Sequence, residues 1–392
     1  MSQLLLSQRL PDDLVYEILT LLPVKSLIRF RCVSKSWYCT ITNHNFIMAQ
    51  FDRSKSLFNN NNNDNNSAYM FFTQKKPNVY MLNITSFYRK EFCTAVYNSD
   101  RTLTEISRYQ APCCFGVAGC CRGMFYFVHE AEYKVEKENN RMYFWNPSIR
   151  KFKKVQLTPL NIHDAVVYGL AYHYQDNDYK ILRIIFDPIF HQRNVKPKPA
   201  EAEIYTLSTD SWRRVVISVE SSSGSKPIES VHYELKGPPC FVFFNGALHC
   251  IACSQDHKFI MYFDVNDERF REILLLQNYV DGLISRYSQH LAVFKGLLAL
   301  IVFYGNSKII HIWMMKEYGV AESWIKKSVP MKEDLWFLGI TVNGELLIQK
   351  FNPFRTLAFH PASLNEEILE IPDYKCMYTD FWVESLLLLD GI

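Results

Sequence analysis

A loose repeat that runs through residues 68–392 is the feature that most constrains the fold of this chain. Each unit contains an apolar strand, a tight turn, a second apolar strand and a later aromatic strand, and the units recur about every 50 residues. Glycine precedes the second strand, as a hairpin turn requires, at Gly123, Gly246, Gly296 and Gly344. A period of this length is typical of a four-stranded propeller blade, so the repeat predicts an all-β, propeller-like domain.

The number of units predicts about six blades. Five units are complete, and they lie around residues 121–126, 168–182, 244–249, 294–298 and 342–347. Incomplete units lie at both ends of the domain, at residues 69–72 with 80–82 near its start and at residues 384–389 at its end. Because each end lacks the rest of a blade, we expect the two ends to share one blade and to close the ring.

Residues 10–47 carry a helical pattern instead. Pro11 suits a helix start, where its missing N–H is not needed, and Asp12 and Asp13 suit the positive end of a helix dipole. Apolar residues then recur at helical spacing, at Leu14, Ile18, Leu21 and Leu22. The pattern therefore predicts a first helix that begins near residue 11.

Two further short helices are expected in the same module. Pro23 ends the first helix, residues 24–30 predict a second helix, and residues 33–41 predict a third helix that carries Trp37. A module of about 40 residues cannot bury this much apolar surface in a core of its own. Part of that surface should therefore be covered by a partner.

The tract between the two patterns is rich in asparagine, from Asn59 to Asn66 with Asp64 within it. A segment with so little to bury predicts a flexible linker or loop, and metal binding or prion-like association are the weaker alternatives. The chain is thus expected to be an α+β multidomain protein. Its predicted parts are a three-helix module over residues 1–50, the Asn-rich linker over 51–67 and the propeller-like domain over 68–392.

Composition narrows the class of protein. Hydrophobic residues make up 48% of the chain, which predicts a globular fold, and a net charge of +3 argues against a nucleic-acid binder that acts through bulk electrostatics. The apolar run at residues 4–6 is too short for a secretion signal, and no run is long enough to span a membrane. Eleven cysteines without regular spacing indicate reduced thiols. We therefore expect a cytoplasmic or nuclear protein.

The helical module closely resembles the plant F-box motif, in the order, spacing and type of its residues. The matching segments are Leu10-Pro11-Asp12-Asp13-Leu14, Ile18-Leu19, Leu22-Pro23-Val24-Lys25-Ser26-Leu27, Phe30 and Cys32-Val33-Ser34-Lys35-Ser36-Trp37. The repeat domain resembles the plant F-box-associated domain, through Trp145-Asn146-Pro147, Asp178-Tyr179-Lys180, residues 245–249 and residues 312–324. The block around Trp313 and Tyr318 also looks like the S-locus F-box branch. Two departures are Cys250, where the family usually carries tryptophan, and the Asn tract.

The resemblance implies a substrate-recognition subunit of an SCF-type E3 ubiquitin ligase, without catalysis or a cofactor of its own. The F-box would bind a Skp-type adaptor, and through it a cullin scaffold, while the repeat domain binds a target protein. In the S-locus branch that target would be a self-incompatibility ribonuclease. Adaptor-facing positions implied by the motif are Leu10, Pro11, Leu14, Ile18, Pro23, Leu27, Val33 and Trp37. An F-box scaffold or a sensor of small ligands or glycans, without degradation of a target, is the alternative.

Two basic segments are candidates for contact with the target. Arg150 and Lys151 belong to the densest basic run, which otherwise reads as a solvated turn between blades. Arg193, Lys196 and Lys198 lie in a long, proline-containing loop between strands of one unit, and binding loops are often long.

Other chemistry-bearing clusters favour packing over function. Cys113-Cys114 and Cys120-Cys121 are adjacent pairs, whereas zinc sites usually need two intervening residues so that both sulfurs converge. His249, Cys250 and Cys253 follow a hairpin turn inside an apolar strand, so core packing is expected rather than a nucleophile or a ligand set. No glycine-rich phosphate loop or hydrolase motif occurs, which argues against an enzyme.

Overall fold

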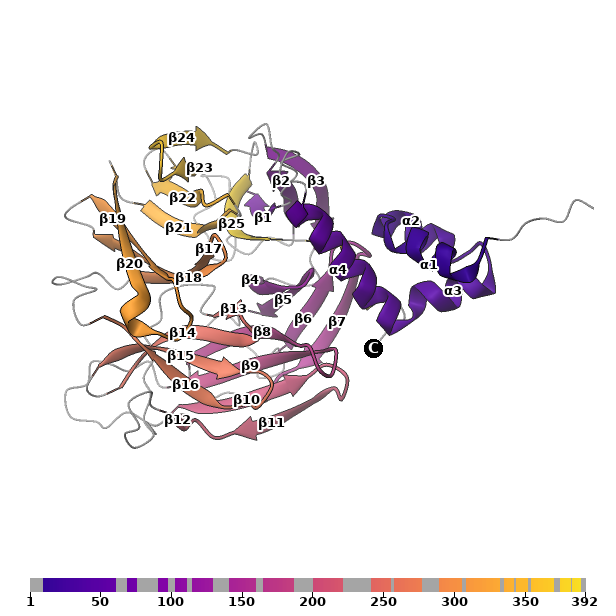
Figure 1. Cartoon of the computed structure of the whole chain (residues 1–392), viewed down its shortest axis with the longest axis horizontal. Helices are drawn as coiled ribbons and strands as arrows, with labels where there is room; N and C mark the ends of the chain where they lie inside the picture. The colour runs from indigo at the N-terminus through magenta and orange to yellow at the C-terminus, as the bar shows by residue number, and fades with distance from the viewer. Residues whose placement is uncertain are drawn as a thin grey trace, which may run out of the picture.

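The computed structural model shows a short helical module followed by a ring of β-sheets (Figure 1). It describes residues 10–60, 69–75, 91–97, 103–110, 115–129, 141–159, 165–186, 200–220, 241–254, 257–276, 289–304, 308–331, 335–341, 343–351, 354–369, 374–381 and 383–388.

The helical module contains the three expected helices and a fourth that was not expected. The helices are α1 (Asp12–Thr20), α2 (Val24–Phe30), α3 (Lys35–Thr42) and α4 (His44–Asn60). Asp12 and Asp13 occupy the first turn of α1, and the hydroxyl of Ser34 caps α3 by accepting from the N–H of Trp37 at 3.1 Å. Residues 51–60, expected to belong to a flexible linker, continue α4 because Phe46 and Phe51 on this helix are buried against the rest of the protein.

Six sheets form the rest of the described chain, in agreement with the predicted six blades. Blade 1 contains β25 (Tyr374–Phe381), β1 (Tyr69–Lys75), β2 (Glu91–Tyr97) and β3 (Leu103–Gln110). Blade 2 contains β4 (Phe115–Cys121), β5 (Met124–His129), β6 (Arg141–Asn146) and β7 (Lys151–Gln156). Blade 3 contains β8 (Ala165–His173), β9 (Asp178–Phe186), β10 (Glu201–Thr206) and β11 (Ser211–Val215).

The second half of the ring has the same plan with one addition. Blade 4 contains β13 (Val242–Phe244), β14 (Ala247–Cys253), β15 (Lys258–Asp264) and β16 (Phe270–Leu274), and β12 (Val219–Glu220) pairs parallel with β16. Blade 5 contains β17 (Gln289–Phe294), β18 (Leu297–Tyr304), β19 (Ile309–Met315) and β20 (Trp324–Pro330). Blade 6 contains β21 (Leu335–Ile340), β22 (Leu346–Phe351), β23 (Phe354–His360) and β24 (Asn365–Ile368).

The ring closes through blade 1, where β25 from the end of the chain pairs antiparallel with β1 from the start of the domain. Contacts between the inner strands β4, β8, β13, β17, β21 and β25 then run around the whole ring. Closure by both ends confirms the predicted shared blade, but the predicted closing segment is wrong. Residues 384–389 were expected to form that strand, whereas the described part of this leucine run, Leu386–Leu388, is buried as an irregular segment. The early segment 80–82 lies outside the described residues.

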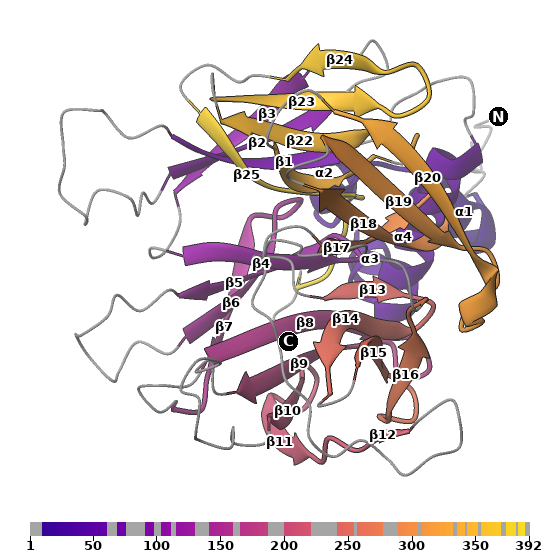
Figure 2. The same ribbon diagram turned by 90° about the vertical axis from the view of Figure 1, so that its left-hand side faces the viewer.

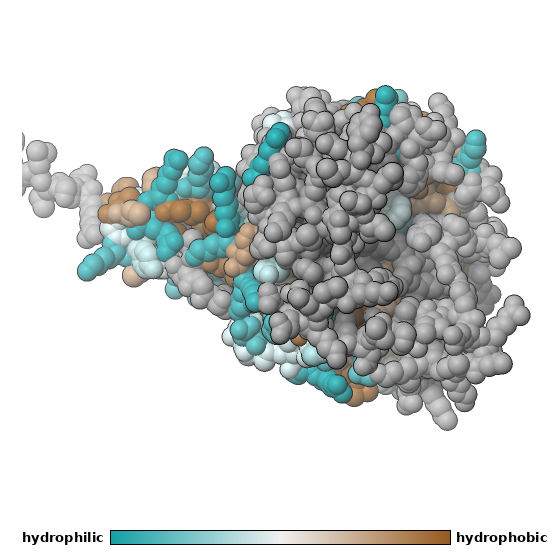
Figure 3. All heavy atoms as spheres, turned by 180° about the vertical axis from the view of Figure 1, so that it is seen from behind, coloured by the Kyte–Doolittle hydropathy of each residue, from teal (hydrophilic) through white to brown (hydrophobic). Residues whose placement is uncertain are grey.

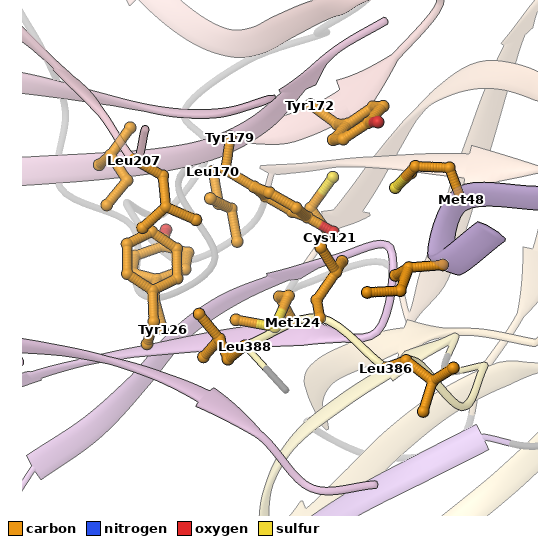
Figure 4. Packing of buried hydrophobic residues seen from close by; sticks show 14 of the residues in the cluster. Met48, Cys121, Met124, Tyr126, Leu170, Tyr172, Tyr179, Leu207, Leu386 and Leu388 are labelled. Atoms are coloured by element: carbon orange, nitrogen blue, oxygen red, sulfur yellow. The ribbon is translucent and has the colours of Figure 1, made fainter. Parts of the chain in front are cut away.

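One buried cluster joins the helical module to blades 2 and 3. It includes Leu19 and Val24 from the helices, Met124 from β5, Leu170 from β8 and Leu386 from the chain end. Figure 4 shows Met48 of α4 beside Cys121, with Met124 and Leu388 in the same cluster. The helices therefore share a core with the propeller and are not joined to it by a linker alone.

Polar side chains link neighbouring blades. The Lys180 ammonium on β9 donates to Glu268 at 3.0 Å and to the carbonyl of Val265 at 3.3 Å, so it joins blade 3 to blade 4. His249 on β14 bonds Tyr318, which follows β19, so it joins blade 4 to blade 5. Buried polar groups that find such partners fix how adjacent blades pack.

Candidate adaptor-binding surface

Helix α1 carries apolar side chains on two faces. Val15 and Leu22 pack toward the shared core with the fully buried Leu19, and the ring of Tyr16 meets Phe46 of α4 edge-on at 5.3 Å. The opposite face points outward. Leu14 and Ile18 lie four apart on this face and therefore above one another, and Leu10 just before the helix and Leu21 at its C-cap extend the row into a stripe.

The outward stripe is about half exposed along its length. The exposed fractions are 56% for Leu10, 51% for Leu14, 48% for Ile18 and 48% for Leu21. Single exposed apolar residues are ordinary on protein surfaces, but a continuous row on a short helix is typical of an interaction site. Figure 3 shows hydrophobic side chains gathered at the helical end of the molecule.

Other predicted contact residues divide between surface and interior. Pro11 and Pro23 are exposed, and Val33 is 61% exposed. Trp37 is half-buried against the ring of Phe30 at 5.4 Å. Leu27 is fully buried in the shared core, so its assignment to the partner-facing surface is wrong: its place on α2 turns it inward.

Two exposed apolar residues were missed as contact candidates. Leu21 continues the stripe three positions after Ile18, and that spacing was readable in the sequence. Tyr38 on α3 is 44% exposed, and the guanidinium of Arg31 lies 4.9 Å from the centre of its ring. No sequence pattern distinguished Tyr38 from a core aromatic residue.

The second and third helices carry basic side chains. Lys25, Arg29 and Lys35 are exposed. A hydrophobic centre with a charged rim is the usual composition of a protein–protein interface, and positive charge at the rim favours an acidic partner.

Matches to known families decide what the two parts are. Residues 7–48 match the model described as F-box domain, and residues 70–352 match the model described as F-box associated beta propeller domain. The chain belongs to the F-box-associated propeller family.

Relatives of this chain are named as F-box proteins. The chain is 26% identical to the F-box protein At3g07870 of Arabidopsis thaliana, over 82% of this chain and 72% of that protein. It is 26% identical to the F-box/kelch-repeat protein At3g23880 of the same plant, over 81% of this chain and 78% of that protein. It is 23% identical to the F-box protein CPR1 of Arabidopsis thaliana, over 97% of this chain and 89% of that protein.

Of the candidate target-binding residues, the structure describes Arg150 and Lys151. Arg150 and Lys151 are exposed at the hairpin between β6 and β7, and the pairing of Phe125 with Trp145 places this hairpin at the same end of blade 2 as the β4–β5 turn. That turn contacts α4 through Arg122. The basic hairpin is therefore on the F-box side of the propeller, and it joins two strands of one blade rather than two blades as expected.

The other basic candidates, Arg193, Lys196 and Lys198, lie outside the described residues. The strands on either side of them belong to one sheet, as expected, since β9 ends at Phe186 and pairs with β10. Phe186 pairs with Ala165, at the end of blade 3 away from the β8–β9 turn, where the ring of Tyr174 lies 5.3 Å from the Arg122 guanidinium. Strand β9 therefore ends, and β10 begins, at the end of blade 3 away from the β8–β9 turn (Figure 2).

The propeller cysteines whose side chains the structure describes are buried or partly buried. Cys121 is buried and Cys120, next to it on β4, is partly exposed, while Cys113 and Cys114 lie outside the described residues. No group of three potential metal ligands occurs within the described part of the chain. Among the same described helices, none is both long and apolar enough to cross a membrane.

His249 is buried in an aromatic cluster. Its imidazole stacks on Tyr262 at 5.6 Å between ring centres, and its Nε2 lies 2.6 Å from the hydroxyl of Tyr318. Its Nδ1 lies 3.3 Å from the carbonyl oxygen of Val242. Burial lowers the pKa of His249 to about 4, so the ring is neutral near pH 7, with Nδ1 donating to Val242 and Nε2 accepting from Tyr318. Cys250 is buried beside it and Cys253 is partly exposed, at the other end of β14.

Proposed function

We propose that this chain is the substrate-recognition subunit of an SCF-type E3 ubiquitin ligase and is not itself an enzyme. The outward apolar stripe of α1, formed by Leu10, Leu14, Ile18 and Leu21, carries this proposal. Full burial of one such side chain contributes roughly 1.5–3 kcal/mol, so a partner that covers the stripe gains most of the affinity it needs there. A Skp-type adaptor on this stripe, with a cullin scaffold behind it, fits the exposed basic rim of Lys25, Arg29 and Lys35.

In this function the propeller holds a target protein and the chain works in the cytoplasm or nucleus, where ubiquitin ligases act on soluble targets. The target is captured either by the F-box-side hairpin with Arg150 and Lys151 or by the loop with Arg193, Lys196 and Lys198. Reversing the charges of each set separately, and comparing the proteins captured in cells after proteasome inhibition, distinguishes the two. If a captured protein is lost from only one of the two variants, the residues reversed in that variant bind the target.

The adaptor site is tested by removing side chains from the stripe. Leu14→Ala with Ile18→Ala should weaken binding of a purified Skp-type adaptor by about 2–3 kcal/mol, or roughly 30- to 150-fold, measured by titration calorimetry. Alanine favours helices, so the circular dichroism spectrum should not change. Leu10→Ala with Pro11→Ala tests the start of the stripe in the same way.

A matched control replaces exposed apolar residues of similar size on the propeller. Leu364→Ala with Ile368→Ala removes residues that are 50% and 55% exposed in blade 6, far along the chain from the F-box. Adaptor affinity should be unchanged in this control. Wild-type affinity in the stripe variant would overturn the assignment of α1 as the adaptor site.

A further inference from the structure

The last described segment, residues 383–388, lies between the F-box and the propeller and contacts both. Leu386, Leu387 and Leu388 are buried in the shared cluster that also contains Val24 of α2 and Met124 of β5. The closing strand β25 already ends at Phe381, so this segment is not needed to close the ring.

Blade 2 holds the segment through Asn146. The side-chain amide of Asn146, which is fully buried, donates to the carbonyl oxygens of Ser385 at 2.9 Å and Leu387 at 2.8 Å. Its Oδ1 accepts from the N–H of Ser148 at 2.9 Å, and the Ser148 hydroxyl accepts from the N–H of Ser385 at 2.9 Å. The segment is therefore fixed to the β6–β7 hairpin by side-chain bonds that leave little freedom to slide.

Residues 383–388 contact the F-box at the start of α2. The carboxylate of Glu384 accepts from the backbone N–H of Val24 at 3.0 Å. Helix α2 follows Pro23, which offers no side-chain cap, so Glu384 supplies the acceptor from 360 positions away. A negative charge is favourable at this end of a helix, because the free N–H groups there carry positive partial charge.

A second attachment lies on α4. Arg122, in the β4–β5 turn, donates to Asp52 at 2.6 Å, and its guanidinium lies 4.4 Å from the ring centre of Phe51. A Cβ on the next residue, Gly123, would come within 2.5 Å of the carbonyl oxygen of Val383 and 3.5 Å of Phe51. Gly123 also has a φ of +77°, so a side chain there would be strained as well as crowded.

We propose that residues 383–388 act as a strut that fixes the angle between the F-box and the propeller. One attachment, at α4, would leave the F-box free to pivot, whereas a second at α2 prevents that motion. Glu384, Asn146 and Arg122 are then positioning residues. Resting on the proposed function, the strut would hold the adaptor at one set distance and direction from the bound target.

Hydrogen exchange at the first turn of α2 tests the strut without any partner. Glu384→Ala should speed exchange of the peptide that contains Val24 by about fivefold, the effect expected for the loss of one helix cap. Glu384→Gln keeps an acceptor oxygen and should exchange close to wild type. Glu322→Ala, at an exposed glutamate of the β19–β20 connection, is the matched control and should leave this peptide unchanged. Wild-type exchange in Glu384→Ala would overturn the proposal.

Small-angle scattering of the complex with the adaptor tests the angle itself. Truncation after residue 382 keeps β25 but removes three buried leucines, so the free energy of unfolding should fall. Under conditions where the truncated chain is still folded, the distribution of shapes should broaden while adaptor affinity changes less than twofold. A scattering curve identical to that of the full chain would contradict the strut. If the wild-type chain does not bind the adaptor, the proposed function fails, but the exchange measurement still decides whether the strut exists.

Discussion

The F-box and the propeller differ in how completely they bury their apolar residues. Blades of the propeller bury theirs against the next blade, as Ile301 of blade 5 and Leu346 and Phe359 of blade 6 do in one shared cluster. Helix α1 buries Leu19 in the same manner but leaves Leu14 and Ile18 half exposed on its other face. A closed ring completes its own core, whereas the F-box leaves an apolar stripe exposed, as interaction sites do.

Polar groups differ between the two regions in the same way. Inside the propeller, the fully buried guanidinium of Arg183 donates to Glu203 at 3.0 Å and to the carbonyl of Thr158 at 3.0 Å. On the F-box, the cations Lys25, Arg29 and Lys35 are exposed to solvent. Charges that are buried and paired specify the fold, while exposed charges beside an apolar stripe select a partner.

The largest effect we expect separates the inward and outward faces of the F-box. Leu27→Ala opens a cavity in the shared core and should lower the free energy of unfolding by about 3 kcal/mol. Leu14→Ala should change it by less than about 0.5 kcal/mol, because this side chain is half exposed and alanine favours a helix. Urea unfolding followed by circular dichroism measures both. Equal losses in the two variants would show that the faces do not differ as the structure indicates.

A smaller effect, confined to the propeller, is expected from His249. Its folded-state pKa of about 4 lies below the usual 6.5 because burial disfavours the charged ring. Between these values the unfolded chain binds a proton that the folded chain does not. Stability is therefore fully present above about pH 6.5 and falls as the pH drops toward 4, by about 2 kcal/mol at pH 5.

Thermal unfolding at pH 7 and pH 5 measures this loss, with His249→Gln as the control. Glutamine does not titrate, so the difference in stability between the two pH values should be smaller in the variant by about the same 2 kcal/mol. An unchanged difference would assign the pH dependence to other groups.

The smallest effect concerns the link between blades 4 and 5. Tyr318→Phe removes the hydroxyl that bonds His249 Nε2 and should lower the free energy of unfolding by about 1–2 kcal/mol, with adaptor affinity unchanged. Tyr174→Phe, at a tyrosine that is 52% exposed, is the control and should have little effect. Denaturant unfolding and adaptor titration of the same samples give both readings, and a loss of adaptor affinity in Tyr318→Phe would contradict the separation of the two regions.

Much of the fold was predictable because its signals are local. The spacing of Leu14, Ile18 and Leu21 marks a helix, and turn glycines such as Gly123 and Gly296 mark hairpins at a blade-like period. Helix α4 was not predicted, because asparagine at its end disfavours helices and the burial of Phe46 and Phe51 that stabilises it is a tertiary effect.

The structural roles of the propeller's motif residues are visible only in the tertiary structure. Asn146 bonds the chain end, Lys180 reaches across to Glu268, and His249 reaches Tyr318. In sequence these positions mark a family resemblance, and none of the partners could be assigned from spacing. All three are structural links, so they are poor candidates for contact with a target.

By itself, the sequence determined the two-part organisation, the number of blades and the apolar stripe, because each follows from periodicities of a few residues or from a regular repeat. Only the tertiary structure decided that Leu27 faces inward, that residues 374–381 rather than 384–389 close the ring, and that Glu384 meets Val24. These depend on contacts between segments hundreds of positions apart. Such contacts form when distant apolar surfaces are buried together, and no local pattern records which surfaces will meet.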